Sequence, residues 1–162
     1  MGPKTARTID RPDIRWAALL IGIVAMVSVA GTALALSGDD AVQARRARFG
    51  EMTDALKFAA NHWDETDRYA EIANAMKVIA RDAKTIPKLF PAGTGIGQGF
   101  RTAALDAIWR DKPGFERLAN ALADEAALLS SINTATPTGD VRHQLEAMIA
   151  TCKACHRDFR AN

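Results

Sequence analysis

The chain has 162 residues, of which 48% are hydrophobic and 25% charged, a composition that argues against a disordered protein and fits one domain plus a tail. It holds 21 Lys and Arg against 19 Asp and Glu, and the excess lies entirely in residues 1–36, because residues 37–162 hold 17 of each sign. Because the charges balance, we expect no basic surface for binding nucleic acid. The chain has only two cysteines, three residues apart, which excludes a fold stabilised by several disulfides.

The N-terminal segment is apolar. Residues 16–36 carry no charge over 21 positions, enough at about 1.5 Å per residue to span a hydrocarbon core of about 30 Å. We predict a single-pass transmembrane anchor there, residues 1–15 as a cytoplasmic tail, and residues 37–162 as a periplasmic domain. A secretory signal, cleaved at the A-x-A sequence of residues 33–35, is the alternative. Both interpretations export the rest of the chain.

The remaining residues predict helices. Apolar side chains recur at three- and four-residue spacing over four stretches, residues 49–63, 69–86, 113–129 and 145–159. Ser37 begins a plausible N-cap, residues 91–99 and 136–139 are loops rich in Pro, Gly or Thr, and residues 100–109 form a short helix. The pattern predicts an all-α protein, an antiparallel four-helix bundle preceded by a single N-terminal transmembrane helix.

The chemistry lies in the sequence Cys152-Lys-Ala-Cys155-His156, because C-x-x-C-H is the attachment sequence of haem c. Two thiols three residues apart lie on one side of a helical turn, where they form thioethers with the two vinyl groups of the macrocycle. His156 then presents its imidazole to the iron. A zinc site needs four ligands, but beyond these residues only His62 and His143 remain, and no βαβ pattern supports a thioredoxin-like motif. We predict one covalent haem c.

With this motif at its end, the chain resembles the class II c-type cytochromes, meaning cytochrome c′ and its low-spin relatives, across residues 41–162. Four segments carry the resemblance, residues 152–160, the Arg48-Phe-Gly-Glu-Met52 pattern, Phe90-Pro91 with its Gly-rich loop, and residues 107–109 before Phe115. The resemblance implies an antiparallel four-helix bundle. Most members of the family are soluble and exported, so the predicted anchor departs from the pattern.

The second axial position of the iron decides the function. The resemblance places the residue four after an Arg of the first helix on that side, and Arg48 then gives Met52 as an axial ligand, whereas a register one turn later gives Leu56. A Met ligand raises the reduction potential and suits electron transfer, whereas an apolar residue leaves the iron five-coordinate and open to nitric oxide. Arg48 is a candidate for binding a haem propionate. The candidates for packing against the haem are Phe49, Trp109 and Phe159.

We therefore predict a membrane-anchored monohaem cytochrome that carries electrons on the periplasmic side of a bacterial inner membrane. Its partners are the membrane, reached through the N-terminal helix, and either redox proteins or a larger respiratory or photosynthetic complex. Binding or buffering of nitric oxide is the alternative. The resemblance also implies a homodimer through the first two helices. No arrangement of nucleophile and base supports an enzyme, and no nucleic acid partner is expected.

Overall fold

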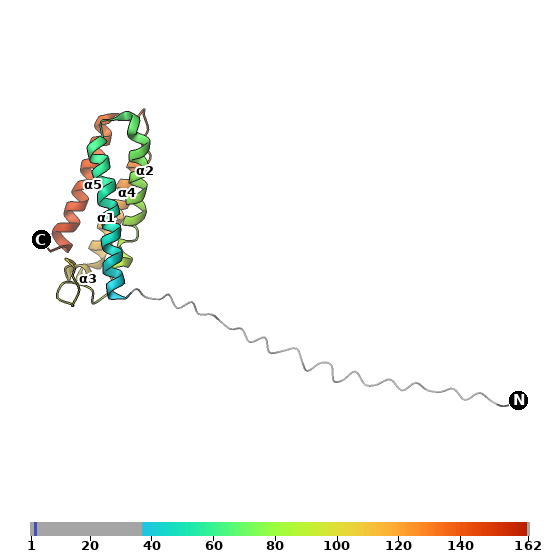
Figure 1. Ribbon diagram of the computed structural model, residues 1–162, viewed down its shortest axis with the longest axis vertical. Helices are drawn as coiled ribbons and strands as arrows, with labels where there is room; N and C mark the ends of the chain where they lie inside the picture. Colours follow the sequence, from blue (N-terminus) through green and yellow to red (C-terminus); the bar gives the residue numbers. More distant parts are fainter. Residues whose placement is uncertain (1, 3–36, 162) are drawn as a thin grey trace. The chain divides into compact units, whose positions relative to one another are not determined.

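The computed structural model describes Gly2 and residues 37–161, so the predicted tail and the anchor of residues 16–36 lie outside the described residues. Four long helices make up most of the described part, namely α1 (Gly38–His62), α2 (Tyr69–Ala83), α4 (Lys112–Leu129) and α5 (Thr138–Phe159). Figure 1 shows them side by side, with the short helix α3 (Ala107–Arg110) and its preceding loop at one end. The predicted all-α helical bundle is confirmed.

Local chemistry sets where the helices begin. The hydroxyl of Ser37 accepts a hydrogen bond from the Asp40 amide at 3.2 Å, so Ser37 caps α1 as predicted. The carboxylate of Asp111 accepts from the Gly114 amide at 3.0 Å and caps α4, whose first turn holds Pro113, a residue without an amide hydrogen to satisfy. These caps satisfy amides that no helical carbonyl reaches.

Two helices have bounds that differ from the prediction. The second was expected over residues 69–86, but α2 ends at Ala83 and the chain tightens into a 3-10 turn, η2, over Ile86–Leu89. Pro87 lies in this turn, where its missing amide hydrogen would interrupt an α-helix. The short helix expected over residues 100–109 covers only Ala107–Arg110.

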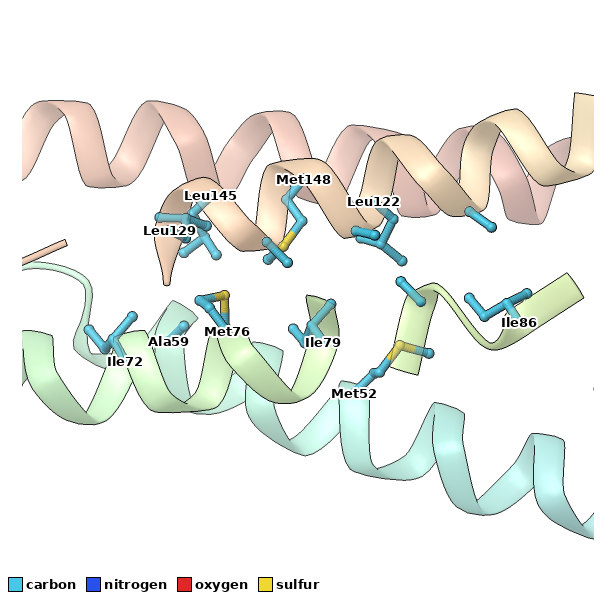
Figure 2. Packing of buried hydrophobic residues seen from close by; sticks show 14 of the residues in the cluster. Met52, Ala59, Ile72, Met76, Ile79, Ile86, Leu122, Leu129, Leu145 and Met148 are labelled. Carbon is cyan, nitrogen blue, oxygen red and sulfur yellow. The ribbon is translucent and has the colours of Figure 1, made fainter. Parts of the chain in front are cut away.

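The core lies between the helices, and Figure 2 shows its side chains meeting from both sides. Tyr69, Met76 and Met148 are fully buried, and Met52 points from α1 into the same interior. Close packing joins α1 to α2, α2 to α4, and α4 to α5, whereas α1 and α5 approach each other much less closely. This open side of the bundle is where the site is built.

The C-terminus is tied to the loop before α3. Ala104 and Arg160 form an antiparallel bridge, the Leu105 amide donates to the Phe159 carbonyl at 3.1 Å, and the Ala161 amide donates to the Ala103 carbonyl at 2.8 Å. These bonds fix the end of α5 against the loop, at the end of the bundle where α1 begins.

Candidate haem site

A cleft runs along the open side of the bundle, between α1 and α5, and consists of two adjoining cavities of about 350 and 120 Å³. Four residues line both cavities and so mark the middle of the cleft: Phe49, Thr53, Cys155 and His156. Cys152 lines the smaller cavity alone. The structure therefore brings the predicted attachment residues to one hollow, and the opposite wall comes from α1.

Burial shifts the pKa values of the predicted attachment residues. Burial raises the pKa of the Cys155 thiol to about 11, with smaller contributions from Cys152 and Asp158. Burial also raises the pKa of the Cys152 thiol, and Glu125 adds to the shift. Partial burial, followed by the charge of Arg160, lowers the pKa of His156. His156 is therefore neutral at neutral pH, the form in which an imidazole binds a metal.

The wall on α1 contains two residues proposed for different roles. Phe49 lies at the middle of the cleft, since it lines both cavities. Met52 lines only the smaller cavity, is 6% exposed, and belongs to the packed core beside Ile79 and Ile86 (Figure 2). The Thr53 hydroxyl donates a hydrogen bond to the Phe49 carbonyl at 2.7 Å, so its hydrogen is not available to a ligand in the cleft.

An arginine that the sequence did not single out lines the larger cavity. Arg45 is 4% exposed, and its guanidinium donates to the carbonyls of Leu89 at 2.6 Å and Thr94 at 2.9 Å and to the Thr94 hydroxyl. It also lies 4.0 Å from the centre of the Phe90 ring. Burial lowers the pKa of Arg45 to about 10. A buried cation with only neutral acceptors favours an anion beside it.

Arg48, the predicted propionate ligand, lies elsewhere. Its guanidinium is 3.1 Å from Glu51 and 3.5 Å from the buried Asp82 of α2, and it lines neither cavity. The four-residue spacing used to pair Arg48 with Met52 fits Arg45 and Phe49 equally well. The structure brings the second pair, not Arg48, to the larger cavity.

Aromatic rings form the end wall of the larger cavity. Successive ring centres are 6.5 Å apart from Phe49 to Phe90, 5.0 Å from Phe90 to Phe115, and 5.3 Å from Phe115 to Phe159, in edge-to-face geometry. Phe49 and Phe159 are therefore at the cleft as predicted candidates. Trp109 is not, because its ring lines a neighbouring hollow and its indole N–H donates to the Phe90 carbonyl at 3.0 Å.

The cleft fits a covalently held macrocycle with two carboxylates. Cys152 and Cys155 are unbonded to each other and half-buried at the cleft, His156 lies beside them, and Arg45 offers an uncompensated positive charge. Such a site defines a c-type cytochrome built on a helical bundle.

Comparison with known proteins identifies the family. The family model described as Cytochrome C′ matches residues 40–160, so the chain belongs to the cytochrome c′ family and carries one covalent haem c. It is similar to a cytochrome c′ of Rhodopseudomonas palustris, with 32% identity over 145 residues that cover 88% of this chain and 97% of the relative. A protein of Cereibacter sphaeroides named cytochrome c-554 is 27% identical, with 88% of this chain and 94% of the relative covered.

Solved structures agree with this fold. The cytochrome c′ structure from Rhodopseudomonas palustris is similar with a TM-score of 0.65 and 32% identity, covering 76% of this chain and 97% of that chain. The structure from Thermochromatium tepidum gives 0.69 at 22% identity, with 79% and 99% covered, and supports the fold alone. Members of the family are haem electron carriers and ligand binders rather than typical enzymes, and homologous cytochromes c′ form dimers.

The predicted localisation in the bacterial inner membrane is wrong, because the chain belongs to a family of soluble periplasmic cytochromes. The alignment with the Rhodopseudomonas palustris relative is longer than residues 37–162, so it extends into the apolar N-terminal segment. Length and lack of charge led to the anchor prediction, and a secretory signal shares the lack of charge in its apolar region, although that region is usually only about 7–15 residues long. Among the helices that the structure describes, none is both long enough and apolar enough to cross a bilayer.

Proposed function

We propose that this protein is a periplasmic cytochrome c′ whose iron binds a small gas such as nitric oxide. When bound, the haem would supply an iron that could take up an external ligand. The observation that supports this is the place of Phe49, which lines both halves of the cleft, opposite Cys155 and His156. Phe49 would therefore lie against the macrocycle across from His156, and its phenyl ring has no atom that could ligate iron, so the metal would stay free for an external ligand.

The other residues of the cleft take positioning roles in this proposal. Cys152 and Cys155 would hold the macrocycle by thioether bonds, and His156 would bind the iron from α5. Arg45 binds a propionate, because it is buried at the larger cavity without a carboxylate partner among the described residues. Phe159 packs against the ring system together with Phe49.

Electron carriage with His156 and Met52 as axial ligands is the second candidate. It is favoured by one observation, that Met52 lines the smaller cavity together with His156. In that case the Met sulfur, not the Phe49 ring, would fill the second axial position, and the cytochrome would not bind external ligands readily.

Visible spectra of the purified holoprotein, oxidised and reduced, with and without carbon monoxide, distinguish the two candidates. We expect a high-spin spectrum that sharpens with carbon monoxide and is unchanged by Met52→Leu. Met76→Leu is the matched control, because Met76 is fully buried and lines neither cavity. A low-spin spectrum that ignores carbon monoxide and becomes high-spin only in Met52→Leu would replace the gas-binding proposal with electron carriage.

We propose that residues 37–162 form the haem domain and that residues 1–35 are an export signal removed after the A-x-A sequence of residues 33–35. The support is that a cytochrome c′ aligns into this N-terminal segment. Mass spectrometry of the periplasmic protein should find Leu36 as its first residue. Full-length protein confined to the membrane fraction would contradict the signal.

A further inference from the structure

Another hollow, of about 450 Å³, adjoins the larger cavity of the haem cleft at the start of α1. Four arginines line it, Arg45, Arg46, Arg101 and Arg160, together with three uncharged residues, and none of residues 37–161 contributes a carboxylate to it. Arg45 and Arg160 also line the larger cavity, so this arginine groove is continuous with the haem cleft. It lies where the carboxylate edge of the haem would be held by Arg45.

The charges of this groove are not neutralised by the described part of the chain. Among the described residues outside the groove, five arginines form ion pairs with carboxylates and two, Arg110 and Arg117, do not; the five are Arg48, Arg68, Arg81, Arg142 and Arg157. None of the four groove arginines forms an ion pair within residues 37–161. Since residues 37–162 are formally neutral as a whole, this is a local concentration of positive charge and not a consequence of a basic protein.

Three segments form the groove, and hydrogen bonds to backbone carbonyls hold them together. The Arg46 guanidinium donates to the Arg101 carbonyl, which joins α1 to the loop before α3. The Ala161 amide donates to the Ala103 carbonyl at 2.8 Å, which joins the same loop to the C-terminus. The backbone that carries the arginines is therefore held in place, so their charges have a defined arrangement before a partner binds.

We propose that the arginine groove docks the acidic surface of a one-electron donor protein, which reduces the haem through its propionate edge. The inference rests on the proposed haem site. Two propionates neutralise at most two of the four charges, and Arg46 and Arg101, which are exposed and line only the groove, remain for the partner. In the transfer the donor loses one electron and ferric iron becomes ferrous, and no bond forms or breaks.

The test uses flavodoxin, a strongly acidic one-electron donor protein, with the holoprotein at an ionic strength of about 0.01 M, where the Debye length is about 30 Å. Isothermal titration calorimetry measures binding of oxidised flavodoxin, and stopped-flow absorbance measures reduction by its hydroquinone. The variant is Arg46→Glu/Arg101→Glu. The control is Arg117→Glu/Arg142→Glu, which makes the same change in charge on exposed positions of α4 and α5 that do not line the groove.

We expect the groove variant to lose about tenfold or more in affinity and in reduction rate, and the loss to vanish at about 1 M salt. The control should stay within about twofold of the unmodified protein. Reduction by the small cation hexaammineruthenium(II) should not slow in the groove variant.

Three results would overturn docking: equal losses in the control, no dependence on salt, or equal slowing with the ruthenium cation, which would show altered access to the haem. Stronger inhibition of flavodoxin binding by inorganic phosphate than by chloride at equal ionic strength would assign the groove to small oxyanions instead. A low-spin spectrum with intact flavodoxin binding would refute the gas-binding proposal and leave the docking inference standing.

Discussion

Replacing Arg45 by Met tests whether the larger cavity is organised by this buried guanidinium. Methionine has a similar length and no charge, so Arg45→Met removes the donors to the Leu89 carbonyl at 2.6 Å, to the Thr94 carbonyl at 2.9 Å and to the Thr94 hydroxyl while retaining much of the packing. It also removes the cation that lies 4.0 Å from the centre of the Phe90 ring.

The expected loss follows from these contacts. Each buried carbonyl left without a donor costs about 1–3 kcal/mol, and the contact with Phe90 adds about 1–2 kcal/mol. Removing a buried positive charge stabilises the folded protein and so offsets part of this loss, because burial of the charge is unfavourable, as the lowering of the pKa of Arg45 to about 10 indicates. We expect the free energy of unfolding to fall by about 2–4 kcal/mol, a large part of the roughly 5–15 kcal/mol that stabilises a domain.

Urea unfolding of the holoprotein, followed by far-ultraviolet circular dichroism, measures this loss. Arg48→Met is the matched control, since the Arg48 side chain is 43% exposed and Asp82 keeps its contact with Arg81 at 2.7 Å. The control should cost no more than about 1 kcal/mol. Equal losses in the two variants, or a larger loss in Arg48→Met, would refute the argument that Arg45 organises the cavity.

Four further outcomes are expected. Met148→Ala should lower the free energy of unfolding by about 2–5 kcal/mol in urea, because this fully buried side chain leaves a cavity, and a loss below 1 kcal/mol would contradict its place in the core. Asp111→Ala should cost about 1 kcal/mol by removing the cap of α4, with no loss if the cap is unimportant. In haem-free protein carrying Cys152→Ala, iodoacetamide should alkylate Cys155 at a rate that still rises above about pH 8.5, since burial raises the pKa of this thiol, and a plateau near 8.5 would contradict that burial. The haem-free protein should also lose stability as the pH falls from about 6.5 through the lowered pKa of His156, because the unfolded state binds the proton more tightly, and His156→Gln should flatten this part of the profile.

The attachment of the haem was readable from the sequence because its chemistry is local. Cys152, Cys155 and His156 lie within five residues of one helix, and their relative placement follows from the helix alone. The helices were readable for a similar reason, since the three- and four-residue spacing of apolar side chains reports which face each helix buries. The end of α2 was missed because Pro87 permits several local geometries, among them the 3-10 turn.

For the N-terminal segment, the local sequence pattern was not sufficient to predict the localisation. Residues 16–36 have the length and apolarity of an anchor, yet a secretory signal also contains an apolar region. Membership of the cytochrome c′ family decided the localisation, and the segment's own composition did not.

The wall opposite His156 depended on the tertiary structure. Arg45 with Phe49 and Arg48 with Met52 have the same four-residue spacing, and the two pairs differ by a rotation of about 60° around α1. Sequence periodicity cannot fix that rotation, because both pairs lie on the broad amphipathic face of the helix. The packing of α1 fixes it: Arg48 is drawn to Asp82 on α2, and Arg45 to the carbonyls of Leu89 and Thr94.

The arginine groove has the same origin. Arg46, Arg101 and Arg160 are far apart in the sequence and meet only because the C-terminus pairs with the loop before α3. The sequence by itself determined the helices and the cofactor and predicted the residues that attach it, all through spacing within single helices. Only the tertiary structure decided which α1 residues line the cleft and where arginines gather without ion pairs among the described residues, because both depend on helix rotation and on contacts between distant segments.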